Sequence, residues 1–126
     1  MNICIAGWYF HRPLLTAIAQ SGYSAFIVKN RDGETCGIPW MLSPENRGLE
    51  FGCYQRYLMG RWDGVSDVLF IQDDGEIVGR ALQEIAELAE NPEIDQAFIF
   101  RDEYEEFMNA GHSGRAFWCR ASFLET

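Results

Sequence analysis

The sequence predicts an α/β domain in which helices flank a mostly parallel sheet, and it assigns the whole chain, residues 1–126, to that one domain. Short continuous apolar runs alternate with segments whose apolar residues recur at helical spacing. Strands that alternate with helices favour parallel pairing through right-handed crossovers. The composition agrees, because 48% hydrophobic and 14% aromatic residues in a chain of 126 residues suffice for one hydrophobic core.

A strand, a helix and a second strand are expected in the first part of the chain. Residues 2–6 form an apolar run without polar alternation, which is typical of a strand covered on both faces. A helix is expected to follow this strand. Pro13 is suited to its first turn, and Gly22 is suited to the position just after its C-terminal end. Residues 23–28 predict the second strand, and the polar residues 29–33 predict the loop at its C-terminal end.

The remaining elements continue the alternation of strands and helices. Residues 34–44 contain glycine and proline and are expected to be irregular, whereas apolar spacing over residues 49–58 predicts a second helix. The run at residues 68–71 predicts the third strand, and a helical stripe over residues 77–89 predicts the third helix. Beyond it we expect a strand at residues 96–100, a short acidic helix or turn at residues 102–109 and a final strand at residues 115–123.

The charge distribution argues against polyanionic partners. Acidic residues outnumber basic ones 19 to 10, and Lys29 is the only lysine. Nucleic acids and anionic membrane surfaces bind clustered basic residues, so neither is expected as a partner. The excess negative charge comes from residues 73–126, where most acids are expected on solvated helix faces.

Cysteine spacing and hydropathy predict the compartment. The four cysteines, Cys4, Cys36, Cys53 and Cys119, have no paired spacing of the kind seen in zinc sites, and we expect free, mostly buried thiols. The sequence shows neither a basic leader nor an apolar run of the roughly 20 residues that span a bilayer. We therefore expect a cytoplasmic protein without a membrane span.

Polar residues follow three of the predicted strands at their carboxyl ends, where open α/β sheets bind their ligands. These loops are residues 7–9, 30–31 and 72–74. The last of them contains Asp73 and Asp74, whose adjacent carboxylates repel each other unless a cation lies beside them. Mg²⁺ and Mn²⁺ prefer such oxygen ligands and complete their coordination with water and substrate phosphates.

Other interpretations of these residues stay open. Asp74 can instead cap a helix that begins just after Gly75, where acids favour the positive helix end. Arg47 is a candidate phosphate ligand, but an ion pair with a neighbouring glutamate explains it equally well. Trp8 and Tyr9 either stack on a nucleobase or pack at the rim of the sheet. The chain has neither a P-loop nor a GxGxxG pattern, which argues against P-loop NTPases and dinucleotide oxidoreductases.

Four segments together resemble the nucleotide-sugar-binding half of GT-A-type glycosyltransferases, a Rossmann-like domain. They are residues 2–6, 45–52, 68–74 and 114–120. In that family the acids after the third or fourth strand form the DXD motif, which holds Mn²⁺ or Mg²⁺ against the diphosphate of the donor. The resemblance implies a metal-dependent glycosyltransferase with a nucleotide-sugar donor, a UDP-sugar foremost, and donor hydrolysis as a side reaction.

The resemblance also implies roles for individual residues. Gln72 occupies the first acidic position of the motif, which makes Asp74 the main metal ligand and Asp73 a ribose or second metal contact. No catalytic residue or acceptor is assigned, because the family's acceptor-binding region would follow the last predicted strand. The implied nucleotide site consists of Ala6, Gly7, Tyr9, Asn30, Arg31, Arg47, Gln72 and Asp73.

Two further hypotheses differ in class. A non-catalytic nucleotide-sugar-binding or assembly module would keep the same fold and form a homo-oligomer through its aromatic surface. A receiver-like signalling domain would need an acidic pair after the first strand and a lysine late in the sheet. The sequence has neither of these features.

Overall fold

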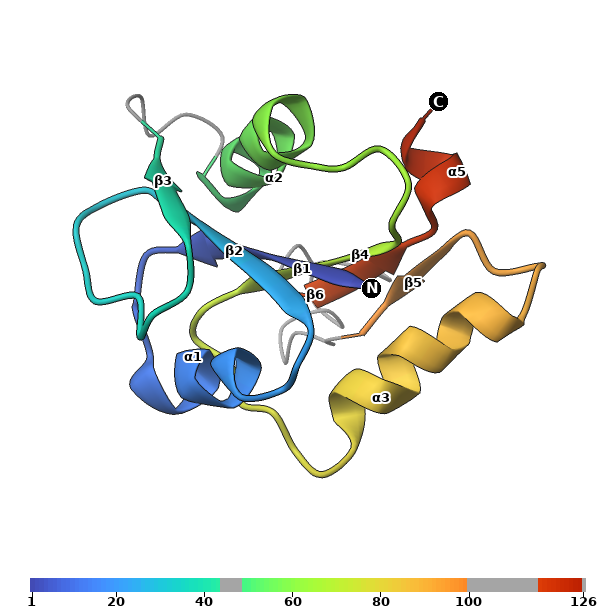
Figure 1. Cartoon of the computed structure of the whole chain (residues 1–126), viewed down its shortest axis with the longest axis horizontal. Helices are drawn as coiled ribbons and strands as arrows, with labels where there is room; N and C mark the ends of the chain where they lie inside the picture. Colours follow the sequence, from blue (N-terminus) through green and yellow to red (C-terminus); the bar gives the residue numbers. More distant parts are fainter. Residues whose placement is uncertain (44–48, 100–115, 126) are drawn as a thin grey trace, which may run out of the picture.

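A mixed sheet forms the central layer of the protein (Figure 1). The structure is a computed structural model that describes residues 1–43, 49–99 and 116–125. Within these residues six strands lie in the order β3-β2-β1-β4-β6-β5. The strands are β1 (Asn2–Gly7), β2 (Ser24–Lys29), β3 (Trp40–Leu42), β4 (Val68–Gln72), β5 (Gln96–Phe98) and β6 (Ala116–Cys119).

The strands β3, β2, β1 and β4 are parallel. β1 pairs with both β2 and β4, and β2 pairs with β3. Cys4 of β1 therefore lies between Phe26 of β2 and Phe70 of β4. Most residues of β1 and β4 are buried, which explains why neither strand shows polar alternation. The first three strands predicted from the sequence are confirmed.

The prediction of a mostly parallel sheet is wrong, because the sheet is mixed. β6 runs antiparallel to both of its neighbours, β4 and β5. All four residues of β6 are buried, so they form the same continuous apolar run as a parallel strand. Burial on both faces removes the alternation by which an antiparallel strand is usually recognised. The α/β class is confirmed, but the sequence pattern does not indicate the direction of β6.

Helices cover both faces of the sheet (Figure 1). On one face lie α1 (Arg12–Ala19) and α3 (Ala81–Ala86), the latter continued by the 3₁₀ helix η1 (Glu87–Glu90). On the other face lie α2 (Leu49–Gly60) and the short α5 (Ala121–Leu124). None of the helices in the described ranges is both long and apolar enough to cross a membrane.

The sheet separates two hydrophobic cores. Side chains alternate along β1, so that Ile5 packs on the side of α1 and α3 while Cys4 packs on the side of α2. The core under α2 is largely aromatic. Its central rings have centroids 5.0 to 5.5 Å apart and belong to Tyr54, Phe70 and Phe117.

Several element boundaries differ from the sequence prediction. The strand expected at residues 96–100 ends at Phe98, and the final strand ends at Cys119 rather than at residue 123, since Ala121–Leu124 form the helix α5. The edge strand β3 forms inside the segment expected to be irregular, since the Ile27 N–H donates to the Pro39 carbonyl and extends the pairing of β2. An edge position tolerates the nearby proline. The third helix begins at Ala81 rather than at residue 77, because Gly79 has a φ of +56°, which interrupts a right-handed helix. The acidic helix or turn expected at residues 102–109 lies outside the described residues.

Candidate functional site

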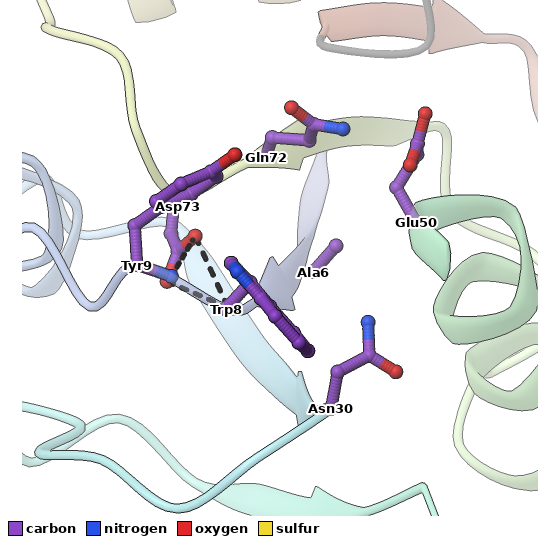
Figure 2. A pocket seen from close by; sticks show the side chains of 7 residues that line it. All are labelled: Ala6, Trp8, Tyr9, Asn30, Glu50, Gln72 and Asp73. Atoms are coloured by element: carbon purple, nitrogen blue, oxygen red, sulfur yellow. Dashed lines mark hydrogen bonds between the residues drawn. The ribbon is translucent and has the colours of Figure 1, made fainter. Parts of the chain in front are cut away.

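A pocket of about 280 Å³ opens beyond the carboxyl ends of β1 and β4 (Figure 2). At this point the strand order reverses, since the chain leaves β1 toward β2 on one side while β4 lies on the other. Such a switch point separates adjacent loops and is where open α/β sheets bind ligands. The described residues that line the pocket are Ala6, Trp8, Tyr9, Asn30, Glu50, Gln72 and Asp73.

Asp73 anchors the loop between β1 and α1. Its side chain is fully buried, and its carboxylate accepts hydrogen bonds from three consecutive backbone N–H groups. The Trp8 N–H lies 3.1 Å from Oδ2 and the Tyr9 N–H 3.0 Å from Oδ1, while the Phe10 N–H donates to Oδ2 (Figure 2 draws the first two). Burying a carboxylate requires such compensation. The bonds fix the backbone that presents two aromatic side chains to the pocket.

Phe10 connects this loop to the loop that follows β2. Its φ of +54° lies in the left-handed region, which a phenylalanine rarely adopts. Its ring lies under Gly33, where a Cβ atom would come within 2.2 Å of the ring. Gly33 thus allows residues 30–33 to pass close over Phe10. The two loops that supply Trp8, Tyr9 and Asn30 are packed against each other.

One wall of the pocket is aromatic. Trp8 and Tyr9 remain 36% and 56% exposed, which leaves ring surface available to a ligand. The Arg31 guanidinium lies 5.2 Å from the centre of the Trp8 ring, in a cation–π arrangement. Arg31 therefore contacts the lining residue Trp8 but does not line the pocket itself.

The rest of the lining is polar. Gln72 ends β4, Asn30 follows β2, and Glu50 projects from the first turn of α2 (Figure 2). The Asn30 side chain also hydrogen-bonds Cys53, whose Sγ lies 3.4 Å from the Val28 carbonyl oxygen to which it donates. These contacts tie the floor of the pocket to α2.

Cys53 is not a nucleophile near neutral pH. Burial raises the pKa of its thiol to about 11, and the nearby carboxylates of Asp73 and Glu50 act in the same direction. The thiol therefore stays protonated.

The one lysine does not face the pocket. Lys29 is only 4% exposed, and its ammonium lies 3.8 Å from the centre of the Trp40 ring and 3.6 Å from Asp32 Oδ1. Neither a lysine nor an arginine occurs among the described lining residues, which include the two carboxylates Glu50 and Asp73.

The structure brings together part of the site expected from the sequence. Gly7 and Arg31 adjoin the lining without belonging to it, and Arg47 lies outside the described residues. Trp8 was considered for stacking but not assigned, and Glu50 was considered only as an ion-pair partner. A carboxylate in the first turn of a helix that follows a parallel strand was the available signal for Glu50. The expected residues that line the pocket are Ala6, Tyr9, Asn30, Gln72 and Asp73.

Asp73 and Asp74 lie in different surroundings. Both oxygens of Asp73 are engaged by backbone N–H groups, whereas Asp74 lines a second pocket of about 210 Å³ between β4 and α3. The alternative of a helix cap at Asp74 is wrong, since α3 begins only at Ala81. Within the described ranges, no three side chains of His, Cys, Asp or Glu gather as metal ligands.

Comparison with protein families, with curated proteins and with solved structures finds no match to this chain.

Proposed function

We propose that this protein is a metal-dependent glycosyltransferase that binds a nucleotide-sugar donor, a UDP-sugar foremost, in the pocket beyond β1 and β4. The observation that carries the proposal is this pocket at the switch point of the sheet, with an aromatic wall facing polar side chains. The strand order β3-β2-β1-β4 supports a Rossmann-like arrangement of the GT-A type.

The aromatic wall suits the nucleoside end of the donor. Trp8 offers an exposed ring face to a base, and Arg31 on that ring strengthens it as a stacking platform. Asn30 and Gln72 present amide groups that can both donate and accept hydrogen bonds to the base and the ribose.

A cation would stabilise the diphosphate of the donor in this pocket. The described lining holds two carboxylates and no lysine or arginine, so a diphosphate placed there would meet like charge. A divalent ion resolves this conflict, which supports the expected need for Mn²⁺ or Mg²⁺. When bound, such an ion would supply stabilisation for negative charge on the departing nucleoside diphosphate.

A binding and turnover assay tests the proposal. Calorimetric titration of UDP with Mn²⁺ should show saturable binding, and incubation with UDP-sugars should release UDP by transfer or by hydrolysis. Binding without release of UDP from any sugar nucleotide would favour the non-catalytic binding module. Absence of UDP binding both with Mn²⁺ and with chelator would overturn the proposal.

A further inference from the structure

Glu50 is the pocket acid whose role the sequence left unassigned. It lies in the first turn of α2, is half-buried, and lines the pocket on a wall adjacent to Gln72 (Figure 2). Within the described part of the chain no hydrogen bond or ion pair occupies its carboxylate. Its carboxylate is therefore a candidate ligand on this wall of the pocket.

The two aspartates after β4 are poorly placed to hold a cation in this pocket. The Asp73 carboxylate already accepts hydrogen bonds from three backbone N–H groups of the β1–α1 loop. Asp74 lines the second pocket, which shares only Gln72 with the first among the described lining residues. A diphosphate in the first pocket would thus lie nearer to Glu50 than to Asp74.

The distribution of charge around the pocket also favours a cation beside Glu50. Glu50 and Asp73 place two carboxylates in the lining of this pocket, and Glu50 also helps to raise the pKa of the nearby Cys53 thiol. Arg31 stands behind Trp8, and the Lys29 ammonium lies against Trp40 and near Asp32. A cation between Glu50 and an anionic ligand would offset the repulsion between these two negative groups.

We propose that Glu50 is the carboxylate ligand of the divalent cation that accompanies the diphosphate, with the side-chain oxygen of Gln72 as its companion. The inference rests on the proposed function and deepens it. Mg²⁺ and Mn²⁺ accept oxygen ligands, and one or two carboxylates completed by water and substrate phosphates suffice to hold them. Such a site needs no cluster of three acidic or imidazole side chains, in agreement with the described residues.

The experiment measures UDP affinity by calorimetry, with Mn²⁺ and with chelator, for the wild type, Glu50→Gln and Asp74→Asn. Mn²⁺ should tighten UDP binding to the wild type and to Asp74→Asn. Glu50→Gln should lose this gain, by at least the roughly 10- to 100-fold that loss of an outer-shell partner costs a metal site. Both substitutions remove one charge and keep side-chain size, so each serves as the control of the other.

A second readout follows the metal itself. The electron paramagnetic resonance signal of free Mn²⁺ should fall when wild-type protein and UDP are added together, and should stay high with Glu50→Gln. Glu50→Asp, which keeps the carboxylate, should restore part of the loss, and thermal melting should show both variants folded. A misfolded Glu50→Gln together with a folded Glu50→Asp that binds no Mn²⁺ would contradict the proposal.

The outcomes separate this inference from the function on which it rests. Mn²⁺-dependent UDP binding that survives in Glu50→Gln and disappears in Asp74→Asn would overturn the role of Glu50 and leave the donor site standing. UDP binding of equal strength with Mn²⁺ and with chelator would overturn the cation site together with the metal dependence of the proposed function, and would leave a nucleotide site standing. Absence of UDP binding to the wild type would overturn the proposed function itself.

Discussion

The Asp73 carboxylate accepts a hydrogen bond from the backbone N–H of Phe10, a residue held at a φ of +54°. The same carboxylate binds the N–H groups of Trp8 and Tyr9, so one buried acid shapes the turn between β1 and α1. The Phe10 ring then supports the loop after β2 through its contact beneath Gly33. An acid that the sequence suggested as a ligand contact thus builds the pocket wall.

Asp73→Asn should destabilise the protein. The substitution replaces one acceptor oxygen with an N–H donor that faces backbone donors, and hydrogen bonds to a charged group contribute about 1.5 to 3 kcal/mol each. The free energy of unfolding in urea should fall by about that amount, and UDP affinity should fall equally with Mn²⁺ and with chelator. Glu93→Gln, at an exposed position, is the control and should leave both unchanged. A loss of affinity confined to the Mn²⁺ condition would instead indicate a metal ligand.

Gly33→Ala should disturb the two loops together. The added Cβ would lie 2.2 Å from the Phe10 ring, so the ring or the loop must move. Overpacking of this kind costs about 1 to 3 kcal/mol and should lower the melting temperature as well as UDP affinity. Gly75→Ala is the matched control, because no atom lies within 4 Å of its added Cβ. Equal melting temperatures for the two variants would contradict the packing described here.

Trp8→Ala should weaken nucleotide binding without unfolding the protein. Stacking of a base on an aromatic ring contributes about 1 to 3 kcal/mol, which corresponds to a roughly 5- to 150-fold loss of UDP affinity. Trp8 is 36% exposed, so the substitution also removes buried apolar surface and should lower the unfolding free energy moderately while the protein stays folded. Trp8→Phe should retain much of the affinity because it keeps a ring. If Trp8→Ala binds UDP with wild-type affinity, the base does not stack on Trp8.

The stability of the fold should decline at alkaline pH. Burial raises the pKa of both Cys53 and Cys119 from about 9 to about 11, so the folded state keeps protons that the unfolded chain releases. Their contribution is complete below pH 9 and is lost as the pH rises toward 11. Urea unfolding from pH 8 to 11 should show this decline, and Cys53→Ala combined with Cys119→Ala should reduce its slope, while the buried Cys4 thiol, whose pKa burial also raises, keeps part of it. A slope unaffected by the double substitution would contradict the assignment to these thiols.

Much of the fold could be predicted because buried strands and amphipathic helices have different periods. The runs at residues 2–6 and 68–71 identified the two central strands, and the rule for carboxyl ends then located the pocket. The direction of β6 could not be predicted, since a strand buried on both faces shows the same apolar run in either orientation.

The roles of the acids could not be read from the sequence either. Asp73 and Asp74 are adjacent, yet one binds backbone N–H groups and the other lines a different pocket. Only the course of the β1–α1 loop, whose N–H groups bind Asp73, distinguishes the roles of these two acids. Glu50 lies 22 residues before Gln72 in the sequence, and it joins the pocket because α2 covers that face of the sheet.

The most direct test of the donor site is a map of amide chemical shifts during titration of the ¹⁵N-labelled protein with UDP and Mg²⁺. We expect the largest chemical-shift changes at the amides of Trp8, Tyr9, Asn30 and Glu50, with a further shift of the Trp8 indole N–H. Changes centred on the second pocket, at Ile77 and Ala81, or no change at saturating UDP, would contradict this expectation.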